Sequence, residues 1–450
     1  MMIRLQYLWE RMRTSYWLLP SWMLLSAALL AWLALYVDSR IGLEVLDGVA
    51  WALVVSSEGA TAVMSTIAGS MVTIAGVVFS ITLVALSLAS GQFGPRMLRN
   101  FIRDRVNQTA LGAFLATFLY CLLVLSAIRH DPLQPFVPHI AVGLGVVLAV
   151  ISVVTLIIYI HHVAVTIQAD TLIEAIYRDL CALMDRLYPE AIGDHAEAPH
   201  AAASDQPHRF DRAPTEVLAD CHAYVQAIDL AGLVAVAAGN DLVIRLRRSP
   251  GQYVLHGSVL MSVWAEQEIE EELRERLRRL VVFGAQRTAT QDVEFALDQL
   301  VEIASRALSP GINDPFTAIT CIDRLASALS LLASRRVPPA WHTDTDGVAR
   351  VYDSPVSFDK AIDAAFDPIR QYARGNAPVT IRMMEVLAEL VPLCRRQRDK
   401  QALSRHADML LRSAVAALPE PHDVADVRSR HRHVAELLHG PPLATTGSGD

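Results

Sequence analysis

The chain has 450 residues, of which 53% are hydrophobic and 19% are charged, with a formal net charge of -8. Its mean hydropathy of +0.32 is too high for a wholly soluble protein. The second half is too charged for a protein embedded entirely in a membrane, so we expect a membrane part and a soluble part. The negative charge argues against a nucleic-acid partner. The five cysteines are scattered and form no C-x-x-C pair, which argues against a disulfide framework and a thiolate zinc site.

Four apolar runs are long enough to cross a membrane. The first covers residues 17–37, and at about 21 residues it is longer than the apolar core of a signal peptide, so we expect an uncleaved span. The second lies within residues 59–95, the third near 109–128 and the fourth near 137–159. None of the four contains Asp, Glu, Lys or Arg, which disfavours a proton-coupled relay or a charge-dependent pump.

The second run carries a distinctive pattern on one face. As a helix, its roughly 37 uncharged residues would extend about 55 Å, more than a hydrocarbon core of about 30 Å requires. Small or hydroxylated residues recur there at every third or fourth position. Small residues gain nothing against lipid but let helix backbones approach closely, so we expect this face to meet protein or water. This small-residue stripe consists of Ser65, Gly69, Thr73, Gly76, Ser80 and Ser87.

The stripe has two interpretations that the sequence leaves open. It can form a tight packing seam, against the chain's own third and fourth spans or a neighbouring chain, with its hydroxyls bonded to carbonyls one turn earlier. Alternatively it lines a pore or solute path, where hydroxyls and exposed carbonyls replace hydration.

Arginines concentrate on one side of the predicted membrane domain. The short flanks shared by the N-terminus and the second-to-third connection hold seven, against Arg40 and Arg129 on the other side. By the positive-inside rule, the N-terminus and the C-terminal half face the cytoplasm from a bacterial inner membrane. Arg96, Arg99 and Arg103 fit this orienting role, and a cytoplasmic pore mouth or a contact with anionic lipid is the alternative.

The rest of the chain predicts a soluble α+β region after the four-helix membrane domain. His161 and His162 follow the fourth span, where snorkelling or capping is favoured over a metal site because no carboxylate or cysteine lies at ligand spacing. Short runs rich in β-branched residues follow, and after them apolar residues recur at helical spacing. The predicted divisions are a transmembrane domain (1–160), an amphipathic stalk helix (161–188), a flexible linker (189–214), a small β module (215–265), a helical bundle (266–440) and a disordered tail (441–450).

The strongest signature of the soluble half is TQDVEFALDQLVEIASRALSPGINDPFTAITCIDRL. It predicts two helices joined abruptly, with an acceptor at the cap, proline at the first helical position and glycine in the preceding turn. The alternative is a set of oxygen ligands for a cation or polar effector, although Arg306 is spaced to neutralise Glu302. The candidate ligands are Asp298, Glu302, Asn313 and Asp314.

Three segments together suggest a family. They are FSITLVALSLASGQFGPRMLRNFIRD, LGAFLATFLYCLLVL and RALSPGINDPFTAITCIDRL. The chain resembles, over most of its length, a widespread bacterial family of predicted inner-membrane proteins catalogued as domain of unknown function 2254. The resemblance implies a multi-pass membrane protein and no particular activity.

Two functions fit these observations. The first is a homo-oligomeric channel or transporter-like protein in the lipid bilayer, gated by its cytoplasmic domain, since four spans per chain make an adequate pathway only on assembly. The second is a membrane-anchored sensor or scaffold with a cytoplasmic ligand- or partner-binding module. We expect no enzyme, because H-E-x-x-H, G-x-S-x-G and phosphate-loop motifs are absent. No cofactor or resident metal is expected.

Overall fold

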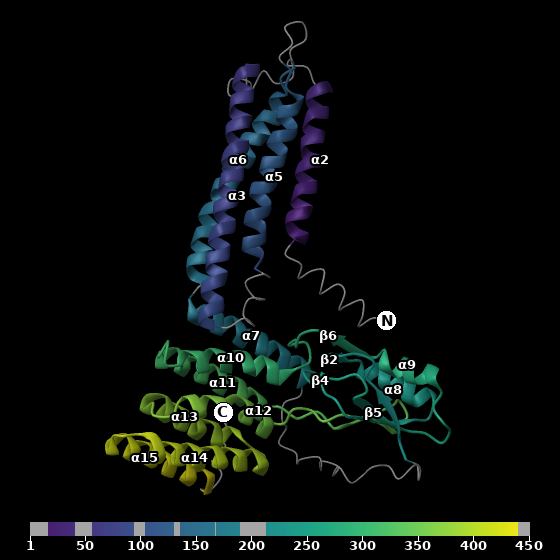
Figure 1. Ribbon diagram of the computed structural model, residues 1–450, viewed down its shortest axis with the longest axis vertical. Helices are drawn as coiled ribbons and strands as arrows, with labels where there is room; N and C mark the ends of the chain where they lie inside the picture. Colours follow the sequence, from purple (N-terminus) through teal and green to yellow (C-terminus); the bar gives the residue numbers. More distant parts are fainter. Residues whose placement is uncertain are drawn as a thin grey trace, which may run out of the picture. The chain divides into compact units, whose positions relative to one another are not determined.

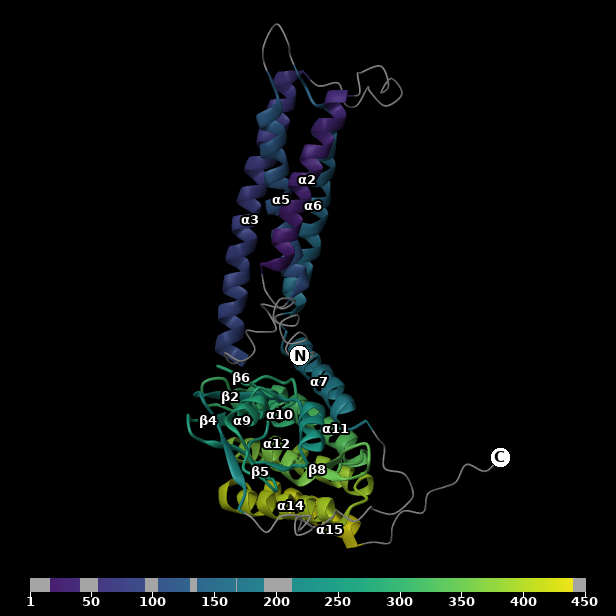
Figure 2. The same cartoon turned by 90° about the vertical axis from the view of Figure 1, so that its right-hand side faces the viewer.

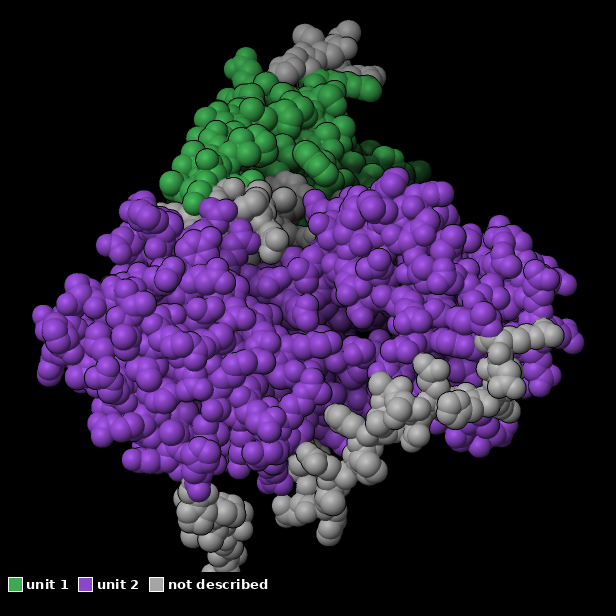
Figure 3. Space-filling model, turned by 60° about the horizontal axis from the view of Figure 1, so that its bottom comes forward, with its two compact units in different colours: residues 1–171 green, residues 172–450 purple. Residues whose placement is uncertain are grey.

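A computed structural model gives the fold of the protein. It describes residues 17–40, 56–93, 104–129, 136–166, 168–189 and 213–439. The chain divides into two compact units, residues 1–171 and residues 172–450, shown in two colours in Figure 3. The predicted arginine cluster of Arg96, Arg99 and Arg103 lies outside the described residues, as do most of the predicted linker and the tail.

Unit 1 is built from long apolar helices that run side by side in Figures 1 and 2. The central helix is α5, because it packs against the other three and half of its most apolar window is buried, compared with 22% for each neighbour. The helices are α2 (Leu18–Arg40), α3 (Ser57–Phe93), α5 (Arg105–Ala127) and α6 (His139–Thr166). Each is long and apolar enough to cross a membrane.

The interior of unit 1 combines small and large side chains. Alanines on the buried faces of α2 and α3 let these helices approach α5 closely. Large side chains fill the space that remains, and Phe114, Tyr120 and Tyr159 are each fully buried. The space between α2, α3, α5 and α6 of a single chain is therefore packed with side chains.

The predicted continuous stalk is divided into two helices. Helix α6 ends at Thr166, and α7 (Ala169–Leu187) begins three residues later, so the prediction of one helix over 161–188 is wrong. The amphipathic pattern is present on α7, whose apolar face is buried. That face consists of Leu172, Ile173, Ile176, Leu180, Leu183 and Met184.

The β region of unit 2 forms two sheets. One has the strand order β1-β5-β3-β8-β7 and the other β4-β2-β6. The sequence predicts a β module within 215–265, but β6, β7 and β8 come from the segment 266–440, which was predicted as a helical bundle. The bounds are β1 (Thr215–Leu218), β2 (Ala223–Ile228), β3 (Val243–Leu246), β4 (Tyr253–Val254), β5 (Val259–Trp264), β6 (Val281–Gly284), β7 (Trp341–Thr343) and β8 (Ala349–Tyr352).

Two short helices accompany the sheets, α8 (Leu230–Gly239) and α9 (Glu271–Arg278). Asp229 begins α8 because its carboxylate accepts a hydrogen bond from the Gly232 amide at 2.9 Å. One side of α8 packs into the core between the strands through Leu233, Val236 and Ala237. The other side is available to form a surface.

The remaining helices form the bundle predicted for the C-terminal half. Helix α11 packs against α10, α12 and α13, and half of its most apolar window is buried. It is the fifth described helix whose length and composition would allow a membrane crossing. The helices are α10 (Val293–Ala307), α11 (Pro315–Ser334), α12 (Phe358–Tyr372), α13 (Ala377–Leu390), the 3-10 turn η4 (Val391–Leu393), α14 (Gln397–Ala417) and α15 (Pro421–His439).

Candidate functional site

The small-residue stripe lies on the face of α3 that points away from the rest of unit 1. All six of its residues are exposed, and a Cβ atom added to Gly69 or Gly76 would meet nothing within 4 Å. At about 100° per residue, the buried face of α3 falls roughly half a turn from the stripe. That buried face consists of Ala60, Met64, Ala68, Met71, Ala75, Val78 and Ala85.

This placement decides one of the alternatives. A seam between the stripe and the chain's own third and fourth spans does not form, because alanine and methionine occupy that interface instead. The expected back-bonding of hydroxyls is present, since Ser65 donates to the Ala62 carbonyl at 3.1 Å and Thr73 to the Gly69 carbonyl at 3.0 Å. Whether the stripe packs on a neighbouring chain or lines a path stays a prediction.

Polar side chains inside unit 1 join one helix to another. The hydroxyls of Thr117 on α5 and Ser152 on α6 are 3.0 Å apart. The Tyr120 hydroxyl donates to the Ala141 carbonyl at 2.9 Å. Such bonds between helices substitute for the water that a hydrocarbon interior lacks, and they restrict how each helix can rotate.

Two carboxylates define the two ends of unit 1. Asp38 on α2 accepts hydrogen bonds from the backbone amides of Ile140 and Ala141, at 3.0 and 2.9 Å. These amides belong to the first turn of α6, where donors lack partners within the helix and a negative charge is favoured. At the other end, Asp104 caps α5 and lies 2.5 Å from Nε2 of His162.

The His162 contact refines the sequence interpretation. The sequence predicts snorkelling or capping for His161 and His162, whereas the structure shows His162 in contact with the carboxylate of Asp104, the residue that caps α5. Sequence spacing missed this partner because it lies 58 residues away. The contact of Asp38 was missed for the same reason, because Asp38 is 102 residues from the Ile140 amide that it caps.

The abrupt joint between α10 and α11 is confirmed. Asp314 accepts hydrogen bonds from the Thr317 amide at 3.1 Å and the Thr317 hydroxyl at 2.6 Å. The hydroxyl bond holds the pKa of the Asp314 carboxyl below its usual value. Asn313 adopts a φ of 50°, a left-handed conformation that Asn tolerates, and Pro315 opens α11.

The other candidate ligands are engaged elsewhere. Asp298 pairs with Arg287 at 2.9 Å, and Glu302 pairs with Arg306 at 3.5 Å, as the spacing predicted. Across the part of the chain that the structure describes, no group of three or more His, Cys, Asp or Glu side chains is placed to hold a metal ion. A polar effector at these residues stays a prediction.

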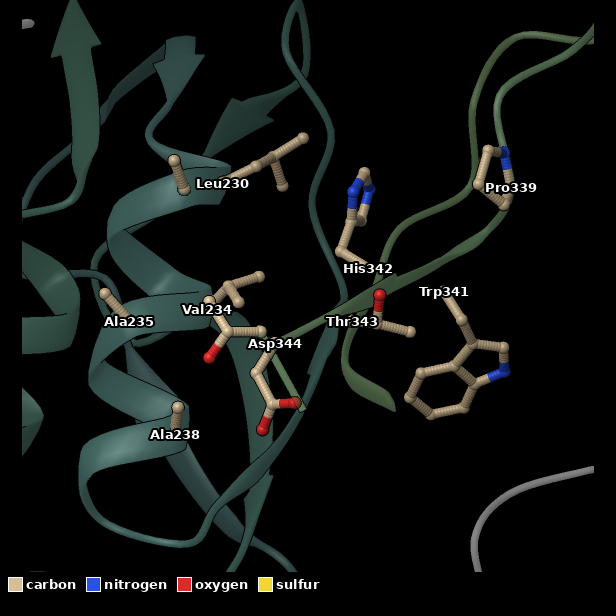
Figure 4. A pocket seen from close by; sticks show the side chains of 11 residues that line it. Leu230, Val234, Ala235, Ala238, Pro339, Trp341, His342, Thr343 and Asp344 are labelled. Atoms are coloured by element: carbon tan, nitrogen blue, oxygen red, sulfur yellow. The ribbon is translucent and has the colours of Figure 1, made fainter. Parts of the chain in front are cut away.

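A groove that the sequence did not predict lies between α8 and β7. It has a volume of about 810 Å³. One wall is the apolar outer side of α8, and the other carries aromatic and polar side chains (Figure 4). The lining residues on α8 are Leu230, Ala231, Val234, Ala235 and Ala238, and those opposite are Pro339, Trp341, His342, Thr343, Asp344 and Thr345.

Ion pairs hold the polar wall of the groove in place. Asp344 accepts a hydrogen bond from Arg350 at 2.7 Å, and this bond lowers the pKa of the Asp344 carboxyl. Arg350 also donates to Asp241 at 2.6 Å, which connects the β7–β8 hairpin to the end of α8. The hairpin turn contains Asp346 followed by Gly347, a dipeptide typical of β-hairpins that could have predicted this feature.

Comparison with known proteins identifies the family. A protein-family model, described as predicted membrane protein (domain of unknown function 2254), matches residues 13–389. The chain belongs to this family. Uncharacterized proteins of Mycobacterium tuberculosis and Mycobacterium bovis are 31% identical to it over 398 residues, which cover 86% of the chain and 75% of each relative. No solved structure matches the chain significantly.

The match to domain of unknown function 2254 covers unit 1 from before α2 and most of unit 2, but not η4, α14 or α15. It begins before α2 and ends within α13, so it includes the stripe, the α10–α11 joint and the groove. The resemblance drawn from the sequence is confirmed, and with it the assignment as a membrane protein with bacterial relatives.

Proposed function

We propose that this member of domain of unknown function 2254 is a homo-oligomeric channel or transporter-like protein of the bacterial inner membrane. The observation that carries the proposal is the outward position of the stripe on α3, opposite the face that packs inside unit 1. Small residues gain nothing from lipid, so a neighbouring copy or a pathway between copies is the environment that suits them.

The packing of unit 1 supports a pathway between copies rather than within one. Phe114, Tyr120 and Tyr159 fill the space between its helices. Symmetric association through α3 would place several stripes around a common axis, where carbonyls and hydroxyls can face a solute. Unit 2 would then gate the pathway, and no catalysis is assigned to the chain.

We further propose that four helices cross the membrane and that α11 does not. Two charged residues lie in the middle of α11 and both have partners in unit 2. Asp323 accepts from Arg382 at 2.7 Å, and Arg324 pairs with Glu174 at 2.9 Å. A helix with such partners and neighbours on several sides suits the interior of a soluble bundle. The excess of arginine on one side supports a cytoplasmic location for the N-terminus and unit 2.

Leucine substitutions on the stripe test the proposal. Gly76→Leu and Ser80→Leu add bulk where the single chain has open space, so the fold of unit 1 should be unaffected. Purified variants reconstituted in vesicles should still assemble but show reduced or altered flux. Ser70→Leu is the control, because Ser70 is exposed on α3 outside the stripe.

The outcomes separate the alternatives. Wild-type vesicles that pass no ion or small solute under voltage, tension or osmotic load would contradict a channel. A wild-type chain that is monomeric in the bilayer would contradict the assembly as well. Loss of assembly on Gly76→Leu, without any flux in the wild type, would favour a scaffold.

The groove beside α8 favours the second candidate, a membrane-anchored sensor or scaffold. Its wall of alanine and valine faces Trp341 and His342, a combination that suits the apolar side chains of a peptide segment. A photo-crosslinking amino acid at His342, compared with one at the exposed Val415 of α14, would detect a partner in living cells. Equal labelling at both positions would count against a binding role for the groove.

A further inference from the structure

The groove beside α8 follows the free edge of strand β7. This strand ends the five-stranded sheet, with β8 on one side and no strand of the described residues on the other. Trp341, His342 and Thr343, which are consecutive in β7, all line the groove. Side chains alternate between the two faces of a sheet, and Figure 4 shows His342 and Trp341 on opposite sides of the strand. Neighbouring residues line the same groove because it runs along the edge of their strand.

Backbone groups of β7 point to this free edge. The Ala340 carbonyl accepts a hydrogen bond from the Asp353 amide at 2.8 Å, so its backbone faces β8. The Asp344 amide donates across the hairpin at 2.9 Å and faces the same way. Backbone groups alternate between the two edges of a strand, so those of Trp341 and Thr343 point outward. An edge of this kind is a template for a further strand.

The wall formed by α8 leaves room for the side chains of such a strand. Ala231, Ala235 and Ala238 are exposed on α8, and Val234 is half-buried between them. These small side chains keep the helix apart from the strand edge, and the groove volume of about 810 Å³ is in the range of ligand pockets. A strand added to β7 would direct every second side chain towards this wall.

One end of the groove is negatively charged. Asp344 and Asp241 both bind the buried Arg350, and the Asp346 amide donates to the Asp344 carboxylate at 3.0 Å. Three aspartates therefore surround one arginine, and Asp346 is exposed to solvent. Helix α8 ends just before Asp241, and the C-terminus of a helix carries partial negative charge. A basic side chain of an occupant is favoured at this end.

We propose that the groove binds an extended peptide segment of a partner protein as an additional strand on β7. Backbone groups of the peptide pair with those of Trp341 and Thr343, which gives affinity, and pockets for alternate side chains give specificity. Apolar side chains at alternate positions enter the space beside Ala235, and a lysine or arginine lies at the acidic end. This partner class belongs to the second proposed function, the sensor or scaffold, on which the proposal rests.

Selection from a random peptide library displayed on phage tests the proposal. The full chain in lipid nanodiscs is the target, and selected peptides should carry alternating apolar residues and a basic residue. Ala235→Trp fills the groove from an exposed position and should weaken peptide binding by about tenfold or more. Ala416→Trp is the matched control, because Ala416 is also an exposed alanine in a helix, α14, and it should bind like the wild type. A selection without binding peptides, or peptides that bind Ala235→Trp equally well, would overturn the proposal.

Methylation of the peptide backbone tests strand addition itself. In an added strand, alternate amides face β7 and the others face away from it. N-methylation of the first set should weaken binding by about tenfold per amide, whereas methylation of the second set should have little effect. Equal effects of both sets would overturn strand addition. Binding that is still lost in Ala235→Trp would then leave the groove as a binding site and the second proposed function intact.

Asp346→Asn tests the acidic end of the groove. Asn followed by Gly347 suits the same hairpin turn as Asp followed by glycine, so the groove is preserved. Selected peptides with a basic residue should bind the variant several-fold more weakly at low salt, and less so at high salt. An unchanged affinity would overturn the placement of a basic residue there. Flux measurements on vesicles judge the channel proposal separately.

Discussion

The hydroxyl of Tyr159 on α6 lies 2.8 Å from that of Thr82 on α3, and the same tyrosine contacts the Val78 carbonyl at 2.9 Å. Because Tyr159 is fully buried, these contacts fix which face of α3 turns towards α6. The face on the opposite side of the helix is the small-residue stripe. The rotation of α3 about its own axis therefore determines both how α3 packs inside unit 1 and which surface α3 presents to a neighbour.

Removing the tyrosine hydroxyl should weaken this setting. We expect Tyr159→Phe to lower stability by about 0.6 kcal/mol, the average for hydrogen bonds between membrane helices, and by no more than about 1.7 kcal/mol. Thermal unfolding of the full chain in detergent micelles measures the loss. Tyr36→Phe on the exposed side of α2 is the control and should change nothing. An unchanged midpoint for Tyr159→Phe would show that α3 is held by its apolar contacts alone.

The α10–α11 joint makes a prediction that separates capping from ligand binding. Asp314→Ala removes the acceptor for Thr317 and should cost about 1 kcal/mol, whereas Asp314→Asn should cost much less because Asn is as good a cap. A cation site would lose its ligand charge in both variants. Unfolding midpoints measured with and without added divalent cations provide the comparison. Cation-dependent stabilisation lost in both variants would favour the ligand interpretation.

Removing the Arg287 side chain should lower the stability of unit 2 far more than removing that of its partner Asp298. It donates to Asp292, whose side chain is 3% exposed, and to Asp298, which is 28% exposed. Burial raises the pKa of Asp292, so its charged form depends on the arginine. Arg287→Ala leaves that carboxylate buried without its partner and should cost about 3–5 kcal/mol.

Asp298→Ala is the matched variant for this prediction. It removes a more exposed partner and should cost about 1 kcal/mol or less. Denaturant unfolding of the two variants in detergent measures both losses. Equal losses would mean that Asp298, which the sequence offered as a ligand, contributes more to the bundle than its exposure indicates.

Local features of the structure could be predicted from the sequence. The apolar runs became α2, α3, α5 and α6, and the residues around Asp314 form the expected joint. These signals depend on neighbours within one or two turns, where helical spacing and capping chemistry act directly. The pairing of Glu302 with Arg306 was predictable for the same reason.

Features that join distant segments could not be predicted from the sequence. Strand β8 pairs in parallel with β3, and the residues joined, Ile244 and Val351, lie more than one hundred positions apart. The groove beside α8 exists only because that pairing brings β7 to it. The sequence likewise left open whether the stripe faces the other helices of unit 1. The periodicity of α3 shows that two of its faces differ, but not which face the neighbouring helices cover.

His406 gives unit 2 a dependence on pH. It is 1% exposed on α14, and its Nε2 lies 2.7 Å from an Asp363 carboxylate oxygen. Burial lowers the pKa of His406 despite that carboxylate. The folded protein therefore binds the proton less readily than the unfolded chain, whose histidine titrates near pH 6.5. Stability should be complete above about pH 6.5 and should fall as the pH drops towards the lowered folded value.

A glutamine substitution isolates this histidine. We expect the thermal midpoint of the full chain in detergent to fall between about pH 7 and pH 5, and His406→Gln to reduce that fall because glutamine does not titrate. His431→Gln is the control, since His431 also lies 2.7 Å from a carboxylate, that of Asp408, but is more exposed. It should retain the dependence of the wild type. A midpoint that falls equally in the wild type and His406→Gln would assign the titration to other groups.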